Sequence, residues 1–317
     1  MNARLDGGVG EALAGAAHAH PCPFCGAGSD FAFLAEDRNR RLSDERFAYH
    51  RCRACSTVFM VDVPADLARY YGGGYHPFDE QGAPLWRGDQ ALLDAEAWRV
   101  AALRRIVEPG RLLDIGAGAG GFVAAAQQGG FEVSAVEMDE ECCRYIASQL
   151  GADAHCSDRP IETLRVLPQA RVISLWHVLE HLPRPGEMLE AAAERLEPGG
   201  VLALGVPNPA SIQFRLLRTR WAHLDAPRHL CLIPAPAILQ RARALGLAPV
   251  LQTTSDPSGR SCNVHGWVYG LRGDPSEGPA RGFPLRAGAL LSNAFSPLEH
   301  RGSRGAALTL FLRKPNS

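Results

Sequence analysis

The chain has 317 residues, of which 46% are hydrophobic, and a formal net charge of -1. This hydrophobic fraction excludes a disordered chain and is enough for one large domain with a small one beside it. The near-neutral charge disfavours nucleic acid as the main partner, because proteins that bind phosphate backbones are usually basic.

The first 20 residues contain acids and glycines but no compact apolar run. We therefore expect a disordered tail over 1–20 rather than a signal peptide. No run of 18 apolar residues occurs, so neither a membrane span nor a membrane partner is expected. Without export, the nine cysteines are expected to be reduced thiols or metal ligands in a cytoplasmic protein.

Two cysteine pairs dominate residues 21–60. Cys22 and Cys25 form one C-x2-C motif, and Cys52 and Cys55 form a second after a spacer of 26 residues. Each motif can place two thiolates on one tetrahedral ion, and two matched pairs in one small segment favour a metal over a redox site. We therefore predict a small zinc-ribbon domain with a structural, fully coordinated Zn²⁺.

The next two segments lead into a larger domain. Residues 61–90 contain the aromatic, glycine-rich stretch RYYGGGYHPF and are interpreted as a connector or lid. Residues 91–107 carry apolar side chains at spacings of three and four, which predicts a helix. The remainder of the chain, 91–317, is assigned to one domain.

Strand and helix patterns alternate from residue 111 onward, which predicts an α/β fold with a mostly parallel sheet covered by helices on both faces. Segments 207–235 and 255–300 interrupt this rhythm and are expected to be insertions. The second is rich in glycine and proline, so we expect it to be irregular. The predicted strands are 111–115, 131–137, 152–157, 171–176, 201–208, 247–255 and 306–315. The predicted helices are 120–130, 139–151, 186–200 and 236–245.

The loop LLDIGAGAGGF follows a strand and opens a helix. Gly116, Gly118 and Gly121 satisfy the dinucleotide pattern G-x-G-x-x-G, while Gly116, Gly118 and Gly120 satisfy G-x-G-x-G. A simple tight turn would carry the same glycines. The glycines alone therefore leave the ligand open.

Two acids narrow the choice of ligand. Glu137 ends the second strand, 21 residues after Gly116, where a carboxylate can accept both ribose hydroxyls. Asp114 precedes the first glycine by two residues. An acid there repels a pyrophosphate but attracts a ligand that carries an ammonium and a sulfonium group.

The loop, together with VSAVEMD and LEPGGVLALGVPN, resembles the class I S-adenosylmethionine-dependent methyltransferases over about residues 90–255 and the final strand. The resemblance implies a Rossmann-like, doubly wound sheet of seven strands and S-adenosyl-L-methionine as cofactor. It implies that Glu137 holds the ribose and that Asp158 meets the adenine amino group. The residues that it assigns to the cofactor site are Asp114, Gly116, Gly118, Gly120, Glu137, Asp158 and Trp176.

The stretch HVLEH after the fourth strand places His177, Glu180 and His181 in the zinc-peptidase pattern H-x-x-E-H. Pro183 and Pro185 allow at most one helical turn, which is too short for the peptidase helix. The stretch instead resembles the segment beside the methyl group in small-molecule methyltransferases. Ubiquinone-type O-methyltransferases can hold a divalent metal there with two glutamates and a histidine. His177 replaces the first glutamate, so a Mg²⁺ ion stays an open alternative. In the other interpretation, Glu180 caps the following helix and His181 packs beneath the cofactor.

The stretch WAHLDAPRHL resembles a W-x-x-x-D-x-P-R-H-L segment of methyltransferases from sugar, polysaccharide and natural-product pathways. The resemblance implies that Trp221, Asp225 and Arg228 belong to the substrate wall. His229 is the preferred general base, with His177 as the second candidate, because histidine exchanges protons near neutral pH. Alternatively, Asp225 and Arg228 only pin the loop as an ion pair.

A zinc-binding segment followed by YYGGGYH resembles the sugar C-methyltransferases of deoxysugar biosynthesis. The resemblance implies that Tyr70, Tyr71, Tyr75 and His76 cover the active site, with Tyr71, Tyr75 and His76 touching the substrate. The alternative is that these aromatic residues only pack between domains. His181 is a further catalytic candidate.

The main hypothesis is methyl transfer from S-adenosyl-L-methionine to a small-molecule hydroxyl, in natural-product or polysaccharide biosynthesis. One alternative is an RNA methyltransferase that grips RNA with its zinc ribbon. Another is an S-adenosylmethionine-binding protein without catalysis. The sequence determines neither the acceptor, nor O- against C- or N-methylation, nor the oligomeric state.

Overall fold

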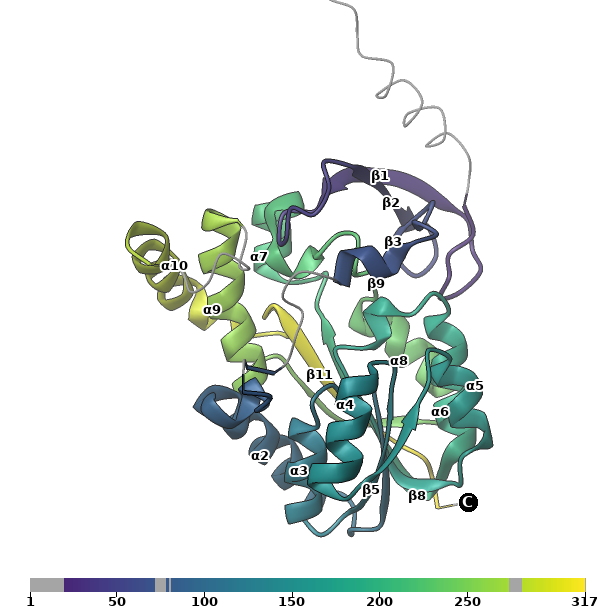
Figure 1. Ribbon diagram of the computed structural model, residues 1–317. Coiled ribbons are helices and arrows are strands. Elements are labelled where there is room, and N and C mark those ends of the chain that lie inside the picture. Colours follow the sequence, from purple (N-terminus) through teal and green to yellow (C-terminus); the bar gives the residue numbers. More distant parts are fainter. Residues whose placement is uncertain (1–19, 72–77, 80, 274–280, 317) are drawn as a thin grey trace, which may run out of the picture.

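The protein is described by a computed structural model that covers residues 20–71, 78–79, 81–273 and 281–316. Almost all of the predicted tail therefore lies outside the described residues. A seven-stranded sheet forms the lower part of the molecule in Figure 1, with strand order β10-β11-β8-β7-β4-β5-β6. Its strands are β4 (Arg111–Ile115), β5 (Glu132–Glu137), β6 (Asp153–Cys156), β7 (Ala170–Trp176), β8 (Leu196–Pro207), β10 (Ala248–Thr253) and β11 (Ala307–Arg313).

All strands of this sheet run parallel except β11, which is antiparallel to both of its neighbours, β8 and β10. The order in which the chain adds strands to the sheet reverses at β4. β5 and β6 lie on one side of β4, and β7 and the later strands of this sheet lie on the other. The prediction of a Rossmann-like, mostly parallel, seven-stranded sheet is confirmed. In such sheets ligands bind beyond the carboxyl ends of the strands, at the point of this reversal.

Helices cover both faces of the large sheet. One core lies under α5, α6 and α8, where Leu164, Leu189 and Ile238 are fully buried. The other lies under α2, α3 and α4, where Leu103 and Val123 are fully buried. The helices are α2 (Gln90–Arg104), α3 (Gly121–Gln128), α4 (Glu140–Tyr145, followed by one π turn to Leu150), α5 (Pro160–Val166), α6 (Pro185–Arg195) and α8 (Ala235–Ala244).

A second, four-stranded sheet lies at the top of Figure 1, with strand order β1-β2-β3-β9. Its first three strands come from the predicted zinc ribbon, but β9 belongs to the segment 207–235. The predicted ribbon and this insertion therefore share one sheet. The strands are β1 (Ser29–Glu36), β2 (Arg46–Cys52), β3 (Val58–Met60) and β9 (Cys231–Leu232). The insertion also holds α7 (Ile212–Leu217) and the 3-10 turns Arg218–Arg220 and Ala222–Leu224.

The prediction of an irregular segment at 255–300 is wrong for its described residues. They form two helices, α9 (Pro257–Arg272) and α10 (Phe283–Glu299), which pack on each other at one side of the molecule (Figure 1). Their glycines allow close contact rather than breaking the helices. A Cβ on Gly288 of α10 would lie 2.6 Å from the Cα of Val268 in α9. None of the helices in the described parts of the chain is long and apolar enough to span a membrane.

Candidate functional site

The glycine loop joins β4 to α3 at the carboxyl edge of the parallel strands. Gly116, Gly118 and Gly120 have φ angles of +70°, +52° and +78°, in the left-handed region that favours glycine. A Cβ on Gly118 would meet nothing within 4 Å, so a ligand can approach the backbone there. Oε2 of Glu137, at the end of β5, accepts a hydrogen bond from the Gly118 amide at 2.8 Å. The loop and the acid thus form one unit.

Asp114 lies beneath this loop and is only 2% exposed. The Ser174 hydroxyl in β7 donates a hydrogen bond of 2.7 Å to Oδ1 of Asp114. Burial raises the pKa of Asp114 to about 7, because the carboxylate loses its hydration. A cationic ligand next to Asp114 would favour the charged form, so this carboxyl is suited to binding a cation.

A cavity of about 350 Å³ opens beside the loop. Asp114, Gly116, Gly118 and Trp176 of the predicted cofactor site line it, as does His177 of the predicted catalytic set. Gly120 begins α3 and packs against side chains of the turn after α4 instead. The structure thus brings most of the predicted cofactor residues to one hollow.

Several residues that the sequence did not indicate also line the cavity, among them Trp86 and Arg99. The Trp86 indole nitrogen, in the turn Leu85–Gly88, donates a hydrogen bond of 2.9 Å to Ala119 of the glycine loop. The Arg99 guanidinium lies 4.0 Å from the centre of the Trp176 ring and 2.7 Å from a Glu96 carboxylate oxygen. In the sequence, Arg99 could have been recognised by its position on the apolar face of the predicted helix 91–107.

His177 and Glu180 form a pair next to the cavity. The backbone of His177 has a φ of +57°. This conformation is held by a hydrogen bond of 2.9 Å that the His177 amide donates to the Gly205 carbonyl. Its Nδ1 atom lies 3.3 Å from Oε1 of Glu180, whose side chain is 1% exposed. Burial raises the pKa of the Glu180 carboxyl, but His177 and two further imidazoles outweigh it and lower that pKa below its usual value. The neighbouring His177 thus favours the charged form of Glu180.

The two further imidazoles are His181 and His229, whose ring centres lie 4.7 Å apart. Nδ1 of His181 lies 3.0 Å from the Arg228 carbonyl, and Nδ1 of His229 lies 2.9 Å from the His223 carbonyl. Both imidazoles therefore lie against backbone carbonyls of the segment 207–235. Burial, together with the charge of His229, lowers the pKa of His181 to about 4, so His181 is neutral at neutral pH.

Glu180, His181 and His229 offer ligand atoms that lie within 4.8 Å of one another. Two imidazoles and one carboxylate suit a transition ion, whereas Mg²⁺ prefers oxygen ligands. The donor set therefore does not fit the Mg²⁺ alternative. HVLEH forms only a 3-10 turn, Leu179–His181, so it is no peptidase helix. No side chain caps the start of α6, so the capping role considered for Glu180 is also wrong.

Arg228 is the centre of a buried polar network. Its fully buried side chain lies 2.7 Å from Asp225 and 2.8 Å from Asp37, and it donates to the Tyr70 carbonyl at 3.1 Å. Trp221 is 2% exposed and lies in the core beneath the same segment. Trp221, Asp225 and Arg228 do not line the cavity. Their contacts fit the alternative interpretation, in which an ion pair fixes the loop.

The remaining predicted site residues lie elsewhere. Asp158 is exposed and lines a separate hollow with Arg184, away from the glycine loop. The Tyr71 hydroxyl lies 3.0 Å from Nδ1 of His181, next to the histidine cluster. Tyr75 and His76 lie outside the described residues.

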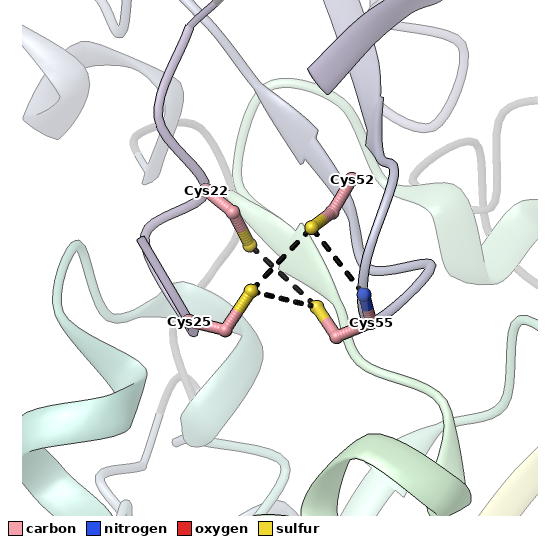
Figure 2. Close-up of side chains that lie close together, drawn as sticks. All are labelled: Cys22, Cys25, Cys52 and Cys55. Atoms are coloured by element: carbon pink, nitrogen blue, oxygen red, sulfur yellow. Dashed lines mark hydrogen bonds between the residues drawn. The ribbon is translucent and has the colours of Figure 1, made fainter. Parts of the chain in front are cut away.

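The four predicted zinc ligands converge in Figure 2. The sulfur atoms lie 3.7 Å apart for Cys22 and Cys55, and 3.4 Å apart for Cys25 with Cys52 and Cys25 with Cys55. A tetrahedral ion with zinc–sulfur bonds of about 2.3 Å separates its sulfurs by roughly 3.8 Å. A disulfide sulfur pair would lie only about 2.05 Å apart. The four thiols therefore fit a closed zinc site.

Comparison with known proteins identifies the family. The family model described as a methyltransferase domain matches residues 86–252, which is more than half of the chain. The chain belongs to this methyltransferase family. The matched range contains the glycine loop, Glu137 and the HVLEH turn, and the prediction of a methyltransferase is confirmed.

Two curated relatives of this methyltransferase are ubiquinone biosynthesis O-methyltransferases. The one from Bordetella avium is 26% identical over 52% of this chain and 71% of its own length. The one from Caulobacter vibrioides is 30% identical over 46% of this chain and 63% of its own length. A mycolic acid cyclopropane synthase has a similar fold, with a TM-score of 0.50 and 15% identity over 76% of this chain and 93% of that one.

Proposed function

We propose that this methyltransferase transfers the methyl group of S-adenosyl-L-methionine to a hydroxyl of a small molecule, most simply a sugar or natural product. The observation that carries the proposal is the cavity at the glycine loop, with an acid beneath it and a paired histidine in its wall. Asp114 would attract the ammonium of the methionine part, and Glu137 would accept hydrogen bonds from the ribose hydroxyls.

Arg99 supports the same orientation of the cofactor. Among the described residues that line the cavity it is the only arginine or lysine, and its position over Trp176 holds it in place. The methionine part carries a carboxylate, so Arg99 would bind one end of this zwitterion and Asp114 the other. Asp158 is not needed in this arrangement.

The proton of the acceptor goes to His177 in the proposed reaction. With its Nδ1 hydrogen toward Oε1 of Glu180, which lies 3.3 Å away, Nε2 of His177 would accept the hydroxyl proton. The acceptor oxygen then bonds to the methyl carbon while the carbon–sulfur bond breaks. The sulfur keeps the electron pair and leaves as the thioether of S-adenosylhomocysteine. Glu180 stabilises the imidazolium, as an acid does behind a catalytic histidine.

The acceptor class rests on the relatives and on the cavity. Both curated relatives named above are ubiquinone biosynthesis O-methyltransferases. The net charge of -1 gives no electrostatic support for RNA as acceptor. The insertion brings His229 and the Arg228 network beside HVLEH, so it would form the acceptor side of the site.

A zinc ion held by the cysteine cluster is the second part of the proposal. With all four positions taken by thiolates, the ion has no open site for chemistry and would only stabilise. The loop between Cys22 and Cys25 packs against α6 at Phe24, because a Cβ on Gly186 of α6 would lie 2.8 Å from the Phe24 carbonyl oxygen. Zinc would thereby fix the small sheet against the large domain.

Two measurements test the proposal. Calorimetry with S-adenosylmethionine and NAD should give micromolar binding of the first and no appreciable binding of the second. A panel of sugar and phenolic hydroxyl acceptors, assayed for S-adenosylhomocysteine, should give turnover with at least one class. Tight NAD binding would contradict the cofactor assignment, and S-adenosylmethionine binding without turnover across the panel would favour the non-catalytic alternative.

A further inference from the structure

Helix α10 presents apolar side chains to solvent. Phe283, Leu290 and Leu298 are 80%, 69% and 48% exposed. With the exposed Ala294 and Pro297, they follow spacings of three, four and seven residues, which place them on one face of the helix. This set of five residues is called the outer face of α10.

The opposite side of α10 packs on α9 through small and polar groups and through Phe295, whose ring stacks on Trp267 with centroids 4.8 Å apart. Gly288 and Ser292 are buried there, and Glu299 is fully buried. Oε1 of Glu299 accepts hydrogen bonds from Gln213 at 2.9 Å and from the Trp267 indole at 2.8 Å. Helix α10 is therefore apolar on its solvent side as well as at its contact with α9, so the outer face is available to a partner.

In the described part of the chain, the exposed charged side chains around the outer face are all arginines. Arg281 and Arg286 are exposed at the start of α10, and Arg301 and Arg304 are exposed just after its end. Among the described residues of 257–304 the only acid is Glu299, which is 0% exposed. The acids of 274–280 lie outside the described residues. The outer face therefore combines apolar side chains with a rim of arginines.

We propose that the outer face of α10 docks the protein on the surface of an anionic lipid bilayer. The 17-residue helix is roughly 25 Å long and would lie in the plane of the interface, with its leucines and Phe283 in the acyl boundary and its arginines on lipid phosphates. This is peripheral binding, in keeping with the absence of a spanning helix among the described residues.

A second copy of the chain is the less favoured occupant. In a two-fold contact between α10 helices, Arg281 of one copy would approach Arg301 of the other, and like charges repel. A bilayer with anionic headgroups neutralises the same arginines. Ser258 and Cys262 of α9 line the cofactor cavity, so docking would hold that cavity near the lipid surface.

Vesicle sedimentation of the full chain tests the proposal. Vesicles of phosphatidylglycerol and phosphatidylcholine should bind the protein at least about tenfold more strongly than phosphatidylcholine alone, and 0.5 M NaCl should weaken the binding. Phe283→Asp with Leu290→Asp should lower it at least about tenfold. Val166→Asp is the matched control, because Val166 on α5 is 81% exposed and lies outside α10.

Circular dichroism and cofactor binding would first show that the variants fold. The proposal is overturned if the double variant binds anionic vesicles like the control, or if the native chain binds neither vesicle. It is equally overturned if light scattering shows a dimer that Leu290→Asp dissociates. Methyl transfer to an acceptor in vesicle-free buffer should be unchanged in the double variant, which separates this result from failure of the proposed function.

Discussion

His177 combines three properties that a general base needs. It reaches the cavity wall, its Nδ1 lies 3.3 Å from Oε1 of Glu180, and its backbone is held at a φ of +57° by a hydrogen bond to Gly205. A non-glycine residue in this conformation is strained, and such strain concentrates at functional sites. His229 lacks the first property, because it does not line the cavity.

Replacing His177 by Asn should lower turnover by about 10²–10⁴-fold while leaving S-adenosylmethionine affinity nearly unchanged. Asn tolerates the left-handed backbone, so the fold should survive. Steady-state rates of S-adenosylhomocysteine formation and calorimetry of cofactor binding measure the two effects.

His229→Gln is the comparison for that variant. Because Nδ1 of His229 bonds the His223 carbonyl, its loss should lower the unfolding temperature together with activity. A His229→Gln variant with native stability and a selective 10²-fold or larger loss of turnover, beside an active His177→Asn variant, would make His229 the base instead.

The buried Asp114 should make cofactor affinity depend on pH. With a pKa of about 7 in the free protein, Asp114 is mostly protonated at pH 6 and mostly ionised at pH 8. S-adenosylmethionine should therefore bind about tenfold more tightly at pH 8 than at pH 6. Calorimetry at both pH values measures this, and Asp114→Asn should bind weakly with no such dependence. An unchanged slope in the variant would assign the effect to another group.

At the scale of elements, the small sheet depends on distant segments. β3 pairs with β9 through Val58–Leu232 and Phe59–Cys231, so the insertion completes a sheet begun near the N-terminus. The Arg228 ion pair with Asp37 joins the same two segments. Loss of the cysteine cluster should consequently also destabilise the insertion 207–235.

Cys52→Ser should reduce the zinc content from one ion per chain to none and disorder the small sheet, because structural zinc supplies folding energy. The large domain should keep its S-adenosylmethionine affinity but lose turnover as β9 loses its partner. Elemental analysis and calorimetry measure both. Cys156→Ser, an exposed cysteine outside the cluster, is the control and should retain the zinc. A native protein that is zinc-free when purified without chelators would refute the assignment.

The packing of α9 on α10 gives a matched pair of substitutions. A side chain on Gly288 meets the backbone of Val268, so Gly288→Leu should destabilise the fold by about 1–3 kcal/mol. Ala294→Leu changes the outer face of the same helix and should cost little. Urea denaturation measures the difference, and equal midpoints for both variants would show that the helices do not pack this closely.

The whole molecule should be sensitive to acid because it buries neutral histidines. Burial lowers the pKa of His181 to about 4 and that of His223 to about 3. Each of these histidines binds fewer protons in the folded than in the unfolded state. Its contribution to stability is therefore complete above about pH 6.5 and is lost as the pH falls toward these two pKa values. Stability should fall by about 1.4 kcal/mol per pH unit for each histidine.

Thermal denaturation at pH 7, 6 and 5 measures this loss. The melting temperature of the His223→Gln variant should depend less steeply on pH over this range than that of the native chain. His300→Gln is the surface control, because His300 is exposed, and should follow the native curve. Parallel curves for the native chain and His223→Gln would exclude His223 as a contributor.

The sequence by itself determined the large domain and the cofactor end of the site. Strand and helix periodicity, the glycines of LLDIGAGAGGF and the acids Asp114 and Glu137 are local signals, because each depends on neighbours within a few residues or on one strand end. The cysteine spacing is equally local, and it predicted the four thiols that converge in the structure.

Tertiary structure alone decided which distant residues meet around the cavity and which are buried away from it. Arg99 reaches the cavity only because α2 packs beside it, and Arg228 does not line the cavity but is buried in an ion pair with Asp37, 191 residues earlier. The glycines of 255–300 resembled helix breakers until α9 and α10 were seen to pack through them. Contacts between distant segments produce no periodic pattern along the chain, so only the folded protein shows which of these residues are buried and which pack closely.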